Sequence, residues 1–278
     1  MNARMVRMIT LAAVVAAAQA GEPAPGGGKV RLLIFSGANN HAWQATTPVL
    51  KKMYEDSGRF TVQVTEDVPH IEPPEFAKYD AIVSNYTSYP MIEGHRWPAA
   101  TEKAFLDFIA AGHGFVLFHA ASTAWGDWPE FGDLIGLTWQ KEPTTGKNIS
   151  GHGAQHSFLV KVVDKTHPVT QGMGDFQHAK DELYHRQLLH PGARVLATTF
   201  SDKAMQGSGT DEPMVVVTEP GKGRVFHCAM GHDPRPMQGV GFRTLMLRGT
   251  EWAATGKVTI PVPAEWPVPG KPQPADPK

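Results

Sequence analysis

The sequence predicts an α/β protein organised around a mainly parallel β-sheet. Short apolar runs that do not alternate with polar residues, such as 30–35 and 115–118, are typical of strands buried on both faces. Amphipathic helical segments separate several of these runs. The first half of the chain thus gives strand, helix, strand, strand, helix, strand, and this order favours parallel pairing through crossover helices.

Each predicted helix has a local signal. The first has Thr47 as a potential cap, Pro48 at its first helical position and Gly58 at its end. The later helices end at Gly112 and Gly256. The second half of the chain is richer in strands. The predicted helices are 46–58, 97–112 and 241–256, and the predicted strands are 30–35, 60–67, 79–86, 115–118, 156–164, 193–200, 213–219 and 223–230.

The first twenty residues are typical of a secretory signal peptide. Arg4 and Arg7 precede an apolar stretch, 8–18, that is too short to span a bilayer. A small-x-small pattern ends at Ala20, and no cysteine follows directly to accept a lipid. We therefore expect cleavage after Ala20 and a periplasmic or secreted protein without a membrane anchor.

The rest of the chain is expected to form a single domain. Residues 21–28 are a flexible lead-in, 29–262 hold the domain, and 263–278 form a proline-rich tail. The chain has 26 basic and 27 acidic residues, and this balance gives no basic footprint for nucleic acid. Cys228 is the only cysteine, so an intrachain disulfide is excluded. The oligomeric state stays open.

Three of the thirteen histidines follow predicted strands. His41 follows the first strand, His119 follows the strand at 115–118, and His232 follows the last strand with Asp233 beside it. The carboxyl ends of parallel strands meet at one edge of a sheet, where such proteins carry their sites. Taken alone, a histidine in a turn is more often a structural hydrogen-bonding residue.

Two polar clusters and a set of tryptophans are further candidates. The clusters are Asp181, Glu182, His185 and Arg186 in DELYHRQ, and His152 and His156 in NISGHGAQHSF. Tryptophans in turn-rich segments could stack on a sugar ring or pack beneath a loop, and they are Trp43, Trp125, Trp128 and Trp139. The sequence contains no G-x-S-x-G nucleophile elbow, Walker loop, dinucleotide fingerprint or H-E-x-x-H motif.

Segments in order along the chain resemble the ThuA-like family, which is named for trehalose utilisation. They are NHAWQATTPVLKKMYEDSGRF, GHGFVLFHAASTAW, THPVTQGM, DELYH, and GKGRVFHCAMGHD with LRGTEWAATG. The similarity extends from about Lys29 to Trp266. It implies the flavodoxin-like fold of the class I glutamine amidotransferases, with a mainly parallel sheet, helices on both faces and extra strands in the C-terminal half.

The resemblance also implies that the amidotransferase reaction is lost. Those enzymes hold a cysteine nucleophile, activated by histidine, at a sharp strand-to-helix turn. The matching stretch here is FHAASTAW, where alanine stands in place of the thiol, and Cys228 lies within the last strand instead. We therefore expect no glutaminase activity. Ser122 could replace the nucleophile in an amide or ester hydrolase, although no motif supports it.

The function that the resemblance implies is carbohydrate catabolism. Family members are linked to trehalose, to related disaccharides and to 3-keto glycosides, so we expect a small-molecule carbohydrate as the partner. Histidines could remove the acidic proton beside a keto group, and Zn²⁺ or a similar divalent metal could stabilise the enediolate, in an isomerisation or elimination. The alternative is a non-catalytic sugar-binding or accessory protein.

We expect one pocket, and the residues that should form it are His41, His119, Glu182, His185 and His232, with His156 nearby. The candidate site residues fall into three groups. The catalytic candidates are His119, His232, Asp233 and Glu182, with Asp233 orienting or tuning His232. The substrate-binding candidates are His41, Trp43, Trp125 and Arg186. The candidate metal ligands are His119, His156 and His185. Which histidine is a base and which is a ligand stays open at this point.

Overall fold

A nine-stranded sheet forms the centre of the protein in the computed structural model, which describes residues 28–89 and 96–270. The strand order is β2-β1-β3-β4-β13-β12-β11-β7-β8. The predicted signal peptide, residues 1–20, lies outside the described residues, as do 21–27 of the lead-in and 271–278 of the tail.

The first five strands of this order are parallel, as the sequence predicts. Their bounds are β1 Val30–Phe35, β2 Phe60–Thr65, β3 Ala81–Ser84, β4 Gly114–Phe118 and β13 Arg224–Cys228. Counted along the chain, these strands have the order 2-1-3-4-5, which is the flavodoxin-like order. The expected fold class is therefore confirmed.

The remaining strands extend the sheet in antiparallel fashion and are the extra strands expected in the C-terminal half. They are β12 Asp211–Thr218, β11 Arg194–Phe200, β7 Leu159–Val162 and β8 Phe176–Gln177. Two short ribbons lie beside the sheet and pair β5 Leu137–Thr138 with β10 Leu188–Leu189, and β6 Gly151–His152 with β9 Tyr184–His185.

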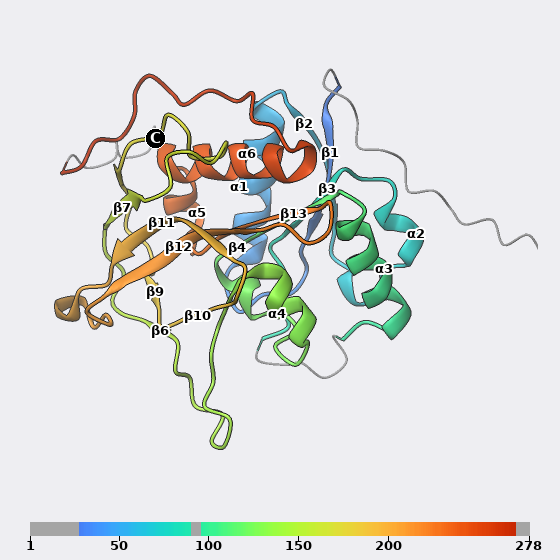
Figure 1. Cartoon of the computed structure of the whole chain (residues 1–278), viewed down its shortest axis with the longest axis horizontal. Coiled ribbons are helices and arrows are strands. Elements are labelled where there is room, and N and C mark those ends of the chain that lie inside the picture. The colour runs from blue at the N-terminus through green and yellow to red at the C-terminus, as the bar shows by residue number, and fades with distance from the viewer. Residues whose placement is uncertain (1–27, 90–95, 271–278) are drawn as a thin grey trace, which may run out of the picture.

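Helices cover both faces of the sheet (Figure 1). On one face lie α1 Trp43–Asp56 and α6 Val240–Thr255, and on the other lie α2 Pro73–Phe76, α3 Ala99–Ala110 and α4 Pro129–Ile135. The short helix α5, Pro234–Met237, contacts α1 and α6. Strand β1 shows why both faces are apolar: Leu32 and Ile34 join one hydrophobic core, while Leu33 and Phe35 join the other.

The start of α1 differs from the prediction. The helix begins at Trp43, so Pro48 lies inside it, and Thr47 is buried and caps no helix end. The Thr47 hydroxyl is 2.7 Å from the Ser36 hydroxyl and accepts a hydrogen bond of 2.8 Å from Asn85 Nδ2. The predicted cap was wrong because Thr47 instead ties the helix to the ends of β1 and β3.

Close packing and tail contacts define the limits of the domain. A Cβ added at Gly114 would lie 2.7 Å from the backbone of Ala253, so α6 rests directly on β4. At the start of the tail, Trp266 Nε1 donates to the Gly174 carbonyl at 3.1 Å, and its ring packs on Phe176. The folded unit therefore includes Trp266. Within the described ranges, every helix is too short or too polar to cross a bilayer.

Candidate metal centre

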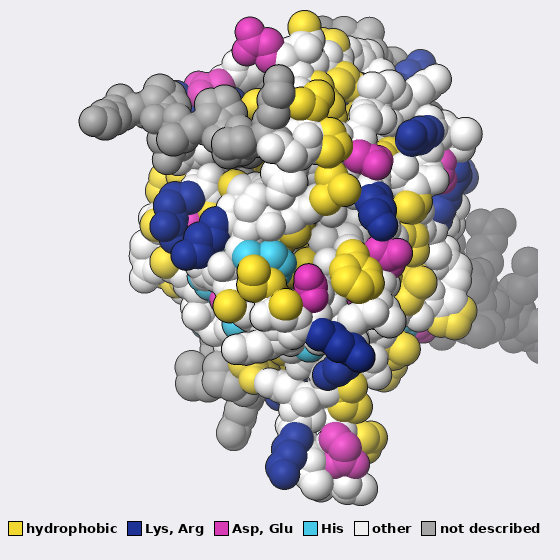
Figure 2. Space-filling model, turned by 90° about the vertical axis from the view of Figure 1, so that its left-hand side faces the viewer, with side chains coloured by type: hydrophobic (Ala, Val, Ile, Leu, Met, Phe, Trp, Pro, Cys, Tyr) yellow, Lys and Arg dark blue, Asp and Glu magenta, His cyan; other side chains and the backbone are white. Residues whose placement is uncertain are grey.

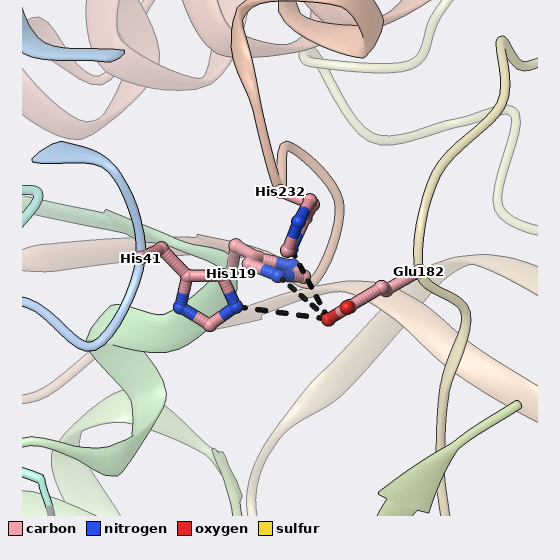
Figure 3. A group of neighbouring side chains, drawn as sticks. All are labelled: His41, His119, Glu182 and His232. Carbon is pink, nitrogen blue, oxygen red and sulfur yellow. Dashed lines mark ion pairs between the residues drawn. The ribbon is translucent and has the colours of Figure 1, made fainter. Parts of the chain in front are cut away.

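Four side chains from distant parts of the chain meet at the carboxyl edge of the parallel strands (Figure 3). His41 comes from the loop after β1, His119 directly follows β4, and His232 comes from the loop after β13. Glu182 lies on the segment between β8 and β9. Their potential ligand atoms all lie within 4.8 Å of one another. The convergence follows from the parallel order, which brings these strand ends together.

One oxygen, Glu182 Oε2, is the centre of the group. It lies 3.2 Å from His232 Nδ1, 3.5 Å from His119 Nε2 and 3.7 Å from His41 Nε2. Both Glu182 Oε2 and His232 Nδ1 are buried and have no hydrogen-bond partner in the described part of the chain. Ligand bonds of about 2.0–2.2 Å in tetrahedral geometry place ligand atoms about 3.4 Å apart. The spacing therefore suits a divalent ion held between these atoms.

Hydrogen bonds at the Nδ1 atoms of His119 and His41 orient the two rings so that their Nε2 atoms face Glu182. His119 Nδ1 lies 3.1 Å from the Ala229 carbonyl, and His41 Nδ1 lies 3.3 Å from Asn39 Oδ1. Since both partners are acceptors, each Nδ1 carries the proton, and each Nε2, on the side of Glu182, is left without one and can accept a hydrogen bond or bind a cation. Metal-binding histidines are held in the same way by carbonyl or carboxylate acceptors.

The electrostatics of the group also favour a cation. Burial raises the pKa of Glu182, but the neighbouring imidazoles of His119, His232 and His41 outweigh it and hold that pKa well below its usual range. The carboxylate in turn raises the pKa of His232, whereas burial lowers the pKa of His41. An ionised carboxylate among imidazoles is a donor set that could hold a divalent metal.

The residue at the sharp turn after β4 is His119 itself. Its φ of 46° is in the left-handed region, which a non-glycine residue occupies only under constraint. We expected an alanine where an amidotransferase holds its thiol, but the strained position after the strand carries this imidazole. Ser122 Oγ donates to the His119 carbonyl at 2.9 Å, and burial raises the pKa of the Cys228 thiol to about 12. Neither side chain is arranged as a nucleophile.

Asp181 holds two ligand-bearing segments together. Its buried carboxylate accepts hydrogen bonds from the backbone N–H groups of Glu182 at 2.8 Å, Gly231 at 2.7 Å and His232 at 3.0 Å. The ring of His178 adds a fourth at 2.8 Å. Burial raises the pKa of Asp181, but His178 outweighs this and lowers it overall. The sequence marked Asp181 within a polar cluster without giving it this role.

Asp233, which we expected to orient His232, has other partners. Its carboxylate accepts from the backbone of Arg235 at 2.8 Å at the start of α5 and pairs with the Arg235 guanidinium at 2.8 Å. Its charge contributes a small part of the raised pKa of His232. The backbone N–H of His232 donates its hydrogen bond to Asp181 instead.

The predicted ligand set of His119, His156 and His185 is not brought together. His156 and His185 lie outside the four-residue group, and His156 Nδ1 donates to the Ala154 carbonyl at 2.8 Å. His185 is buried, and burial lowers its pKa. Neighbouring residues of an extended segment point to opposite sides, so Glu182 and Tyr184 share the side that His185 does not.

Three predicted substrate-binding residues do not line the cavity at the centre. Trp43 is the first residue of α1, and Arg186 is exposed with its backbone N–H on Glu212 Oε2 at 3.0 Å. Trp125 is 1% exposed and packs on Trp97 and other rings of the core. Of the two alternatives that the sequence left open for this tryptophan, stacking on a sugar and packing inside the protein, its burial favours packing.

Two further residues lie at the centre, Tyr184, which the sequence analysis did not single out, and His152, which it gave only as a further candidate beside His156. The Tyr184 hydroxyl donates to His119 Nε2 at 2.9 Å, and burial keeps the pKa of Tyr184 well above its usual value. His152 Nε2 lies 3.7 Å from Glu182 Oε2 and is partly exposed. Strand pairing of β6 with β9 sets His152 opposite Tyr184. A cavity of about 180 Å³ opens onto this group and is lined by Asn40, Trp139 and Tyr89 among others.

The molecular surface carries both signs of charge. On the face drawn in Figure 2, Lys and Arg side chains are interspersed with Asp and Glu, and histidines appear between hydrophobic side chains. This distribution agrees with the net charge of -1.

The trehalose utilisation family model, ThuA, matches residues 31–253 of the chain. Among curated proteins, no match was found. A crystal structure described as a thua-like protein from Parabacteroides merdae is 35% identical, with a TM-score of 0.77, and the match covers 88% of this chain and 97% of that one.

Two other solved structures share the fold at lower identity. A thua-like protein from Bacteroides uniformis is 21% identical, with a TM-score of 0.61 and coverage of 86% of this chain and 97% of that one. A cytoplasmic protein from Salmonella typhimurium is 12% identical, with a TM-score of 0.56 and coverage of 81% and 98%. At these identities the likeness concerns the fold alone.

Proposed function

The chain belongs to the ThuA family of trehalose utilisation proteins, and from that premise we propose that it acts on a disaccharide, a glycoside or a 3-keto derivative of either by metal-assisted acid–base chemistry. The reaction centre is His41, His119, Glu182 and His232. The observation that carries the proposal is Glu182 Oε2, which is buried, has no hydrogen-bond partner among residues 28–89 and 96–270, and is faced by three imidazole nitrogens at 3.2–3.7 Å.

The donor set indicates the kind of metal. Three imidazole nitrogens and one carboxylate oxygen suit Zn²⁺ and also suit other first-row ions that bind imidazole. Such an ion, when bound, would polarise a substrate carbonyl or hydroxyl and stabilise the negative charge of an enediolate. The opening of the cavity onto the group leaves room for a substrate oxygen beside the protein ligands.

The side chains around the centre provide the proton chemistry. A base that removes the C–H proton beside a keto group leaves an enediolate. If the proton returns to the neighbouring carbon, the sugar is isomerised. If instead the glycosidic oxygen leaves and is protonated as it does so, the substituent bound through that oxygen is eliminated. His152 lies on the exposed side of the cavity, where it can exchange protons with solvent, and the protonated Tyr184 hydroxyl lies on the buried side, where it donates.

The site offers no support for acyl-transfer chemistry. The turn after β4 presents an imidazole, Ser122 donates its proton to a backbone carbonyl, and the thiol of Cys228 is buried within a strand. We therefore propose neither glutaminase nor amide or ester hydrolase activity for this protein.

Export belongs to the same proposal. Its support is the sequence of residues 1–20, with two arginines, an apolar stretch and a small-x-small pattern. Expression of the full chain with mass analysis of the exported product tests it. An N-terminus at Gly21 is expected, and retention of residues 1–20 in a cytoplasmic product would contradict export.

The experiment that tests the proposed function measures bound metal and turnover in the same variants. The protein is purified without a chelator or a nickel column and analysed by elemental mass spectrometry, and 3-keto-trehalose consumption is followed by NMR. Glu182→Gln and His119→Ala should lose both the metal and the turnover. His156→Ala, a histidine outside the group, is the matched control and should keep both.

Each outcome decides between the alternatives. About one divalent ion per chain, lost only in the two centre variants, supports the metal centre. Equal metal content in every variant refutes it. Metal at the centre without turnover of any oxidised or unoxidised disaccharide would favour a non-catalytic sugar-binding protein instead.

A further inference from the structure

A second cavity adjoins the one at the metal centre. Its volume is about 310 Å³, and it shares Tyr89, Thr123 and Trp139 with the cavity of about 180 Å³ that contains Glu182. These three residues therefore form the boundary between the two spaces. A ligand that extends from the centre past these residues would reach the second cavity.

The lining of the second cavity is aromatic at its base and polar at its rim. Trp125 and Trp128 line the cavity but are 1% and 4% exposed and pack on other rings of the core, so the partly exposed Trp139 is the tryptophan that can face a ligand. Its ring stands edge-on to the site residue Tyr184 at 5.0 Å between ring centroids. At the rim, the Lys141 ammonium lies 4.6 Å from the centre of the Tyr89 ring. Aromatic faces receive the C–H face of a sugar ring, while an ammonium group donates to its hydroxyls.

The sizes of the two cavities also indicate a ligand that spans them. Small-molecule sites generally have volumes of about 300–1,000 Å³. The cavity at the centre, at about 180 Å³, lies below that range, and the neighbouring cavity of about 310 Å³ brings the combined space within it. One ring at the centre would thus leave the second cavity free for another.

We propose that the cavity lined by Trp128, Trp139 and Lys141 binds the second sugar ring of a two-ring substrate whose reacting ring lies at Glu182. This inference rests on the proposed function, because it takes the Glu182 group as the reaction centre. It adds that the substrate is a disaccharide rather than a single sugar or a glycoside of a small alcohol. The second cavity then sets the preference for the leaving group.

Two substitutions reach the second cavity without touching the metal centre. A Cβ added at Gly126 meets no atom within 4 Å, so Gly126→Leu should place its side chain in the cavity without displacing neighbours. Lys141→Ala removes the rim ammonium. Lys147→Ala makes the same change of charge on the same loop at a residue that does not line the cavity, and it is the matched control.

The assay is titration calorimetry of metal-loaded full-length mature protein. The two-ring probes are trehalose and 3-keto-trehalose, and the one-ring probes are methyl α-glucoside and 3-keto-glucose. Wild type should bind the better two-ring probe at least about tenfold more tightly than the better one-ring probe. Gly126→Leu and Lys141→Ala should weaken two-ring binding about tenfold and leave one-ring binding within about twofold, and Lys147→Ala should change neither.

The possible failures are distinguishable. Unchanged two-ring binding in Gly126→Leu, or equal weakening of both probe classes, overturns the second subsite while the metal centre stands. Tighter binding of p-nitrophenyl α-glucoside than of either disaccharide, lost in Gly126→Leu, assigns the cavity to an aromatic leaving group and overturns the sugar assignment. Absence of binding of every sugar probe to wild type refutes both proposals. Normal metal and turnover in Glu182→Gln refutes the proposed function and with it the place of the reacting ring, whereas a selective loss of two-ring binding in Gly126→Leu would still assign the second cavity to a sugar.

Discussion

Replacement of Asp181 by asparagine is the sharpest test of how the centre is held together. Asp181 Oδ2 accepts from Gly231 N and His178 Nε2, and Oδ1 accepts from His232 N and Glu182 N. An amide has one oxygen, so in either orientation its NH₂ group faces two buried donors that have lost their acceptor. Hydrogen bonds to charged groups are worth about 1.5–3 kcal/mol each, which gives a loss of about 3–6 kcal/mol.

Scanning calorimetry and a metal competition assay measure the two consequences. For a domain of this size a loss of 3 kcal/mol or more lowers Tm by at least about 6 °C. Because Glu182 and His232 lose their common anchor, metal affinity measured against a chromophoric chelator should fall about 10–100-fold, as it does when residues that orient metal ligands are changed. The protein should still fold below the lowered Tm, so both readouts remain available.

Asp233→Asn is the matched control, since it makes the same chemical change at the residue that directly follows His232. Asp233 pairs with Arg235, whose side chain is 67% exposed, so its loss should cost less than about 1 kcal/mol and leave metal affinity within about twofold. A wild-type Tm and metal affinity for Asp181→Asn would refute this reasoning. A selective loss of metal in Asp233→Asn would restore Asp233 as the residue that orients His232.

The remaining predictions concern the body of the fold. His227 is fully buried and burial lowers its pKa to about 4, so the unfolded chain, with a histidine pKa of about 6.5, binds a proton that the folded chain excludes between these values. The free energy of unfolding should therefore fall as pH drops through that window, by about 2 kcal/mol at pH 5. Urea titrations at pH 7 and pH 5 measure this difference, and it should be about 2 kcal/mol smaller in His227→Leu than in the wild type. An equal difference between pH 7 and pH 5 in both proteins would contradict the assignment. Gly114→Ala should lower stability by about 1–3 kcal/mol in thermal unfolding because its methyl group overlaps the backbone of α6, whereas Gly126→Ala should have no effect; equal Tm values would disprove the close packing. A thiol reagent should label Cys228 only after unfolding, because the side chain is fully buried, and rapid labelling of the native protein would show otherwise.

The three histidines of the centre were predicted from local patterns, and Glu182 was placed in the same expected pocket as part of the polar cluster DELYHRQ. His41, His119 and His232 each follow an apolar run that is a parallel strand in the structure. The topology of parallel sheets then brings strand ends together without any knowledge of side-chain contacts. The strand positions and this rule therefore predicted a histidine cluster at one edge of the sheet.

Partners that depend on register were not predictable in the same way. Glu182 and His185 lie in one short polar segment, and a shift of one residue exchanges the side chains that face the centre. The pairing of β9 with β6 and the four hydrogen bonds on Asp181 fix which of them faces inward. These contacts join residues far apart in the chain, and no local periodicity encodes them.

Burial decided the roles of the tryptophans in the same manner. Trp125 and Trp139 both lie in turn-rich sequence, yet Trp125 is enclosed by other aromatic rings and Trp139 borders both cavities. A turn-rich sequence shows that a chain leaves a strand or helix, but it does not show what covers the side chain afterwards.

Local sequence patterns predicted the parallel strands, the three longest helices and the positions at which polar residues leave the sheet, because each depends on hydrophobic pattern within a few neighbouring residues, whereas the flavodoxin-like strand order was implied by the family resemblance. The tertiary structure alone decided that Glu182 and not His185 faces His41, His119 and His232, that Asp181 anchors the segments of Glu182 and His232, and that a second cavity lies beside the group. Those features depend on distances between segments separated by tens of residues. Such distances are set by packing of the whole core, and packing is a property of the folded chain.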